Sequence, residues 1–76
     1  MELEQMYAQI ENVDRQIGQL FARRMELSAS VAREKAAEGI LTPDVSLERA
    51  ARARFRQIAG PGLEGYAGVL FSTLVD

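Results

Sequence analysis

The stretch that decides the fold is IENVDRQIGQLFARRMELSASVAREKAAEGI, residues 10–40. Along it, and along the residues before it, apolar side chains recur in alternating steps of three and four, which is the heptad spacing of a packed helix. One charged residue interrupts this seam, which comprises Leu3, Met6, Ile10, Val13, Ile17, Leu20, Arg24, Leu27 and Val31. We therefore expect one helix over residues 3–38, ended by Gly39 in the left-handed conformation, with Ile40 as its apolar contact.

A second, shorter helix is expected after residue 40. Thr42 is expected to cap it, Pro43 to take its first helical position, and Asp44 to favour the positive end of its dipole. The Gly-Pro-Gly sequence at residues 60–62 ends this helix. Its apolar face comprises Leu47, Ala51, Phe55 and Ile58.

A third helix is expected from residue 63 or 64 onward. Its spacing is typical of a buried face, which comprises Leu63, Tyr66, Ala67, Leu70, Phe71 and Leu74. No segment alternates in the manner of a β-strand. The sequence therefore predicts an all-α fold, a three-helix chain that forms a single domain over residues 1–76.

The first helix is too long for a monomer of this size. Residues 3–38 would span about 54 Å at 1.5 Å per residue, whereas a compact chain of 76 residues has a diameter of roughly 30 Å. Two short helices cannot cover the whole seam, so we expect a homodimer in which the two long helices pack side by side. The alternative is a break at Gly18 that folds the helix into a hairpin, although the heptad spacing continues in phase across that residue.

Composition excludes several kinds of chemistry. The net charge of -2 argues against a dedicated nucleic-acid binder. The chain has no cysteine and no histidine, which removes disulfides, thiolate metal sites, cysteine nucleophiles and the commonest general base. No apolar run is long enough for a membrane span, and no signal peptide opens the chain, so a soluble, cytoplasmic protein without metal or cofactor is expected.

Arg24 is the most informative residue, because a charge in an apolar seam is costly unless an anion meets it. Eleven residues separate it from Lys35, which is almost three full turns, so Arg24, Ser28 and Lys35 share one face of the helix. This cationic strip is what a pocket for a small dianion needs. The alternatives are that Arg24 extends to the surface or pairs with a carboxylate such as Asp14 or Glu48, and that Lys35 lies on a solvated edge.

The second helix carries further charges. Asp44 and Glu48 lie one turn apart at its start, where both suit the dipole, and Glu48 can pair with Arg52 at i+4. A run of four arginines is expected to form a solvated helix face, or alternatively to contact RNA or phosphate, and comprises Arg49, Arg52, Arg54 and Arg56. No glycine-rich phosphate loop and no cluster of metal ligands is present in the sequence.

Taken together, these residues resemble the all-helical chorismate mutase family. The first helix of that family reads I-D-x-I-D-x-x-L-x-x-L-x-x-R-x-x-L-x-x-x-V-x-x-x-K. The matching positions here are Ile10, Val13, Asp14, Ile17, Leu20, Arg24, Leu27, Val31 and Lys35. The resemblance implies intertwined dimers of three-helix chains and the rearrangement of chorismate to prephenate in aromatic amino-acid biosynthesis.

The resemblance also implies roles for particular residues. Arg24 would bind a substrate carboxylate, and Lys35 would donate a hydrogen bond to the ether oxygen, where negative charge develops. Glu48 would accept from the ring hydroxyl, with Asp44 nearby and Ser28 on the same strip as Arg24. Such a reaction holds a flexible substrate in its reactive conformation and requires neither a nucleophile nor proton transfer.

The chain departs from the family pattern at three places. Tyr7 stands where the family has an arginine that reaches into the partner's site, and Leu47 replaces a second carboxylate-binding arginine. The third helix is also expected to be shorter than in the family. The alternatives are therefore a weakened mutase, an inactive ligand-binding, regulatory or dimerisation module on the same fold, and an isochorismate-pyruvate lyase.

Overall fold

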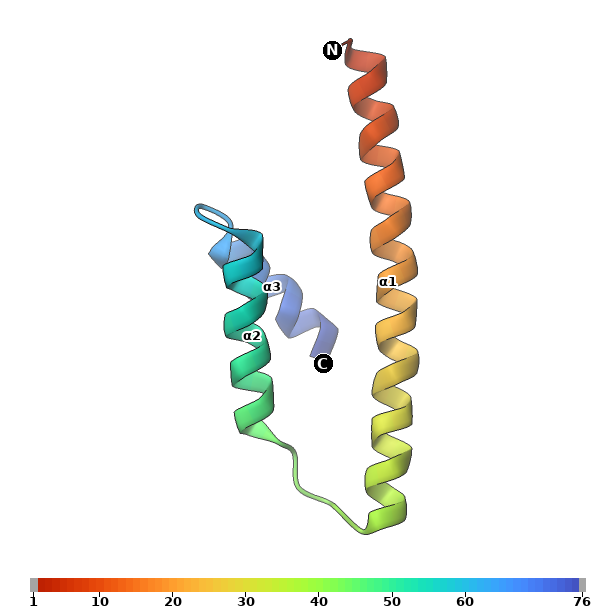
Figure 1. Cartoon of the computed structure of the whole chain (residues 1–76), viewed down its shortest axis with the longest axis vertical. Helices are drawn as coiled ribbons and strands as arrows, with labels where there is room; N and C mark the ends of the chain where they lie inside the picture. The colour runs from red at the N-terminus through yellow and green to blue at the C-terminus, as the bar shows by residue number, and fades with distance from the viewer. Residues whose placement is uncertain (1, 76) are drawn as a thin grey trace. The chain divides into compact units, whose positions relative to one another are not determined.

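The computed structural model describes residues 2–75, and Figure 1 shows the three helices within that range. They are α1 (Leu3–Glu38), α2 (Val45–Ala59) and α3 (Glu64–Val75), and the described residues contain no strand. The expected all-α, three-helix fold class is confirmed. The chain divides into two compact units, residues 1–40 and 41–76, each of which is described by itself.

Helix α1 runs without a break through Gly18, so the hairpin alternative is wrong. It ends as the sequence predicts, because Gly39 has φ 74° and ψ 19°, in the left-handed region. The Gly39 N–H donates to the Ala36 carbonyl at 3.2 Å, and the Ile40 N–H donates to the Lys35 carbonyl at 2.8 Å. These two bonds satisfy carbonyl groups that have no partner further along the helix.

The apolar seam of α1 is open to solvent in its own unit. Its eight apolar side chains are between 44% and 65% exposed, and no described residue of α1 is buried. A stripe of this length is normally covered in a folded protein, because apolar surface in contact with water is unfavourable. The homodimer stays a prediction, and this exposed seam is the surface on which it depends.

The start of α2 differs from the expectation. Asp44, rather than Thr42, is the N-cap, and its Oδ1 accepts a hydrogen bond from the Leu47 N–H at 3.1 Å. Pro43 therefore lies outside the helix instead of at its first position. The reason is that aspartate caps at least as well as threonine and also brings a negative charge to the positive end of the dipole.

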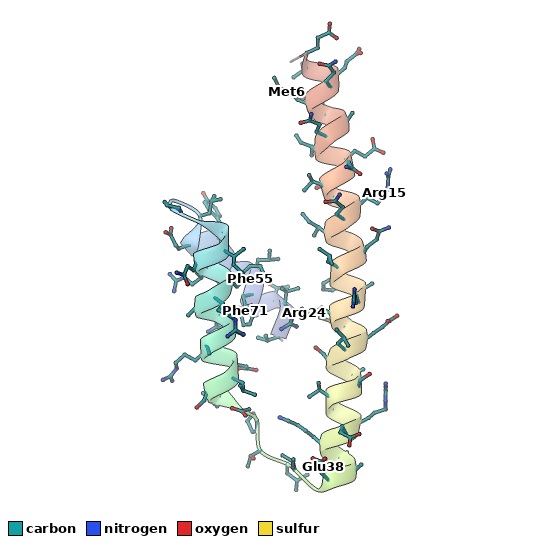
Figure 2. All side chains as sticks on the ribbon, in the orientation of Figure 1. Met6, Arg15, Arg24, Glu38, Phe55 and Phe71 are labelled. Atoms are coloured by element: carbon teal, nitrogen blue, oxygen red, sulfur yellow. The ribbon has the colours of Figure 1, made fainter. Side chains whose placement is uncertain are left out.

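The second unit has a small core where α2 packs against α3. Figure 2 shows Phe55 and Phe71 beside each other, with ring centroids 5.6 Å apart and a 48° angle between the rings. Phe71 and Ala67 are buried. Because α2 and α3 pack only against each other in this unit, each helix buries one narrow stripe of its surface. Outside this contact, Ile58, Leu63, Tyr66 and Leu70 are exposed in the single chain, so their expected burial stays a prediction that depends on a second chain.

Candidate functional site

Arg24, Ser28 and Lys35 lie on one face of α1, because the helix that carries them is unbroken. At about 100° per residue, Arg24 and Lys35 are roughly 20° apart around the axis and roughly 16 Å apart along it. Both side chains are half-buried, whereas Ser28 is exposed. Figure 2 labels Arg24 in the second half of α1. The arrangement places two cations on one face of α1, and their long side chains would have to extend toward each other to reach one small anion.

The neighbouring cations of α1 point elsewhere. Arg33 donates from Nη2 to the Ser30 Oγ at 3.1 Å, and Ser30 in turn donates to the Glu26 carbonyl at 3.1 Å. Arg23 immediately precedes Arg24 and is therefore about 100° away around the helix. The cationic strip is thus distinct from the solvated charges of the same helix, and Arg23 and Arg33 provide matched controls for it.

Asp44 and Glu48, the two acidic candidates, begin α2 in the second unit. Both side chains are exposed. The Asp44 carboxylate already has a structural use as the helix cap, since it accepts from the Leu47 N–H. The Glu48 backbone N–H donates to the Asp44 carbonyl at 3.1 Å, which leaves the Glu48 carboxylate as the acidic group available to a ligand. The structure describes these residues within their own unit, separately from the cationic strip.

The arginine run of α2 is not one solvated face, and this expectation is corrected. Arg52 is half-buried, and its Nη2 donates to the Ser72 Oγ of α3 at 3.2 Å instead of pairing with Glu48. Arg56 donates from Nε to the Glu64 carbonyl at 3.2 Å. Two arginines of the run therefore hold α2 and α3 together. Sequence reasoning missed Arg52, although its place three residues before the core residue Phe55 was a signal that it faces α3.

Tyr7 and Leu47, the two residues that replace family arginines, are both more than three-fifths exposed. Both side chains are uncharged. Among residues 2–75, no three acidic side chains are grouped in a way that could hold a metal ion. In the same range, no helix has both the length and the apolar character that a membrane crossing needs.

Comparison with known proteins gives a single family assignment. The family model for chorismate mutase type II matches residues 6–73, which is most of the chain. The matched range includes all five candidate residues of the site and both uncharged replacements. Neither the curated proteins nor the solved structures contain a significant match.

Proposed function

The chain belongs to the type II chorismate mutase family, and from this membership we propose that it is a mutase that rearranges chorismate to prephenate. The whole chain, residues 1–76, would act as one domain of a homodimer in the cytoplasm. The observation that carries the proposal is the cationic strip of Arg24, Ser28 and Lys35 on the unbroken helix α1.

The strip suits the chemistry of this isomerisation. One C–O ether bond breaks while one C–C bond forms within the same molecule, so no group enters or leaves. The substrate is a dianion, and Arg24 offers a planar guanidinium that can bind one carboxylate with two parallel hydrogen bonds. Lys35 offers a compact ammonium to the ether oxygen, where negative charge accumulates in the transition state.

The acidic residues complete the proposed set of contacts. Glu48 would accept a hydrogen bond from the ring hydroxyl, and this interaction would fix which end of the substrate enters first. Asp44 would lie near the same end while it caps α2. These contacts select the compact, reactive conformer of a flexible molecule, which is the main requirement of a unimolecular rearrangement.

The homodimer is the second part of the proposal. Its support is the apolar seam of α1, which is 44–65% exposed at its eight apolar positions. A parallel, in-register pair would set Arg24 against its own copy, and two like charges in an apolar interface repel strongly. We therefore propose an antiparallel pair, in which each Arg24 meets the N-terminal half of the other helix.

The test follows the loss of chorismate by absorbance with the wild-type chain and two variants. Lys35→Ala is expected to lose about 10²–10³-fold in kcat, by analogy with the removal of a donor to a developing oxyanion. Arg33→Ala removes an exposed cation of the same helix that lies outside the strip, and it should keep wild-type activity. Rates equal to the uncatalysed reaction for both wild type and Lys35→Ala would end the mutase proposal.

A ligand-binding or regulatory module is the second candidate, and a specific observation favours it. Tyr7 and Leu47 are uncharged and exposed where the family has arginines, so less positive charge is available to bind a dianion. Calorimetry with chorismate, prephenate and phenylalanine tests this candidate, and the absence of heat with all three would contradict it. Analysis of the products from isochorismate separates both candidates from the lyase.

A further inference from the structure

Arg52 is a cation whose partners in the second unit are all uncharged. Its Nη2 donates to the Ser72 Oγ at 3.2 Å, and its guanidinium carbon lies 5.5 Å from the centroid of the Phe71 ring. The Nε atom is buried and has no hydrogen-bond partner. No carboxylate among residues 2–75 forms an ion pair with Arg52.

A half-buried cation in this situation is incompletely compensated. Burial removes water from the guanidinium, and one neutral hydrogen bond with one ring contact returns only part of that loss. Arginine has five N–H donors in a planar fork, and Ser72 uses one nitrogen of that fork. Nε is buried and closed to a ligand, which leaves the two Nη1 hydrogens and the second Nη2 hydrogen, and these adjacent nitrogens can bind a carboxylate end-on through two bonds.

The contacts of Arg52 also fix its orientation. Ser72 donates its own hydroxyl hydrogen to the Gly68 carbonyl at 3.0 Å, which leaves an Oγ lone pair to accept from Arg52. The guanidinium carbon also lies over the Phe71 ring. A binding group held in place before its ligand arrives loses less conformational entropy when it binds.

Arg52 lies on the same side of α2 as Glu48. The two residues are one turn apart, which separates them by about 40° around the helix axis. Leu47, at the position of a family arginine, lies about 140° from Arg52, so Arg52 approaches the ligand from a different direction.

We propose that Arg52, oriented by Ser72 and Phe71, binds a carboxylate of the ligand whose hydroxyl is accepted by Glu48. The inference rests on the proposed function for the identity of that ligand. It makes Arg52 a substrate-binding residue that supplies a cation on α2, which the chain lacks at Leu47.

The first experiment observes the arginine Nε–Hε signals of the full-length protein by nuclear magnetic resonance during titration with sodium benzoate. The Arg52 signal is expected to shift and saturate with benzoate, and to stay in place with benzyl alcohol, which has the ring but no carboxylate. Arg54→Met is the matched control, because Arg54 is exposed and about 200° away around the helix. Equal shifts of all exposed arginines, or no shift at Arg52, would overturn the proposal.

The second experiment measures chorismate kinetics. Arg52→Met keeps an apolar side chain against Phe71, and it is expected to raise KM by roughly ten- to a hundredfold, the loss of one charge-assisted hydrogen bond. Arg52→Lys should recover part of that loss, and Arg54→Met should leave KM unchanged. If Arg52→Met does not fold, Ser72→Ala provides a second variant. It removes the hydrogen bond that orients the Arg52 guanidinium but keeps the positive charge, and it should still weaken benzoate binding severalfold.

The role of Arg52 and the mutase proposal can be refuted independently of each other. Turnover of chorismate with an unchanged KM in Arg52→Met would overturn the role of Arg52 and leave the mutase proposal standing. Saturable benzoate binding at Arg52 without any turnover of chorismate would support the carboxylate site and overturn the mutase proposal.

Discussion

Replacing Gly18 with alanine is expected to stabilise the protein. Gly18 lies in the middle of α1, and a Cβ added there meets no heavy atom within 4 Å. The methyl group therefore carries no steric cost, and the helix gains the difference in propensity between glycine and alanine, about 0.8–1 kcal/mol per chain. For a domain of this size, a gain of about 1 kcal/mol raises Tm by roughly 4–8 °C.

The matched control is Gly39→Ala at the end of the same helix. A Cβ at Gly39 also meets nothing within 4 Å, but φ is +74° there, and the left-handed conformation costs a residue with a side chain about 1–2 kcal/mol. The two substitutions add the same methyl group to equally open space. They should therefore change the free energy of unfolding in opposite directions, for reasons that lie in the backbone alone.

Thermal and urea unfolding followed by circular dichroism would measure both changes. The protomer concentration must be the same for all three proteins, because the stability of a dimer depends on concentration. A lower Tm for Gly18→Ala would refute the reasoning. It would show that a second chain approaches α1 so closely at Gly18 that a methyl group does not fit.

Three further variants test the core, the dimer and the site. Phe71→Ala should lower the free energy of unfolding by about 3–5 kcal/mol in urea, because Phe71 is 4% exposed and packs on Phe55. Ile17→Asp, in the middle of the apolar seam, should give a species near 8.4 kDa in sedimentation, whereas the wild type should sediment at about twice that mass. Tyr7→Arg combined with Leu47→Arg should raise kcat/KM for chorismate by at least about one power of ten, since one new carboxylate contact contributes about 1.5–3 kcal/mol and Arg52 is proposed to supply a cation on α2 already. Unchanged kinetics in that double variant would contradict the view that these two positions limit activity.

The features that could be predicted from the sequence are local ones. The spacing of the apolar residues predicted α1 over its full length, and Gly39 with Ile40 predicted the way in which it ends. Both depend on residues within a few turns of each other, so the preferences of the backbone decide them. The shared face of Arg24, Ser28 and Lys35 follows from the same helix and needed no knowledge of what surrounds it.

The features that were predicted wrongly depend on packing or on competition between neighbours. Thr42 was predicted to cap α2, and Asp44 was given only a role at the helix dipole, but Asp44 is the cap. Ile58 has the spacing of a buried residue but is 82% exposed in the single chain, so whether it is buried depends on a second chain and not on α3. Arg52 was assigned to a solvated face, although its place three residues before Phe55 indicated a side that packs; the sequence does not show that Phe71 and Ser72 lie opposite it.

The position of Arg24 between Leu20 and Leu27 has a thermodynamic consequence for self-association. If two copies pair along this seam, the same guanidinium lies in the subunit contact and in the binding site. Filling the site with an anion would then change the charge balance of the subunit contact, so occupancy and assembly become linked equilibria. An increase in ligand concentration would tighten the dimer, and dilution of the protein would weaken its hold on the ligand by the same factor.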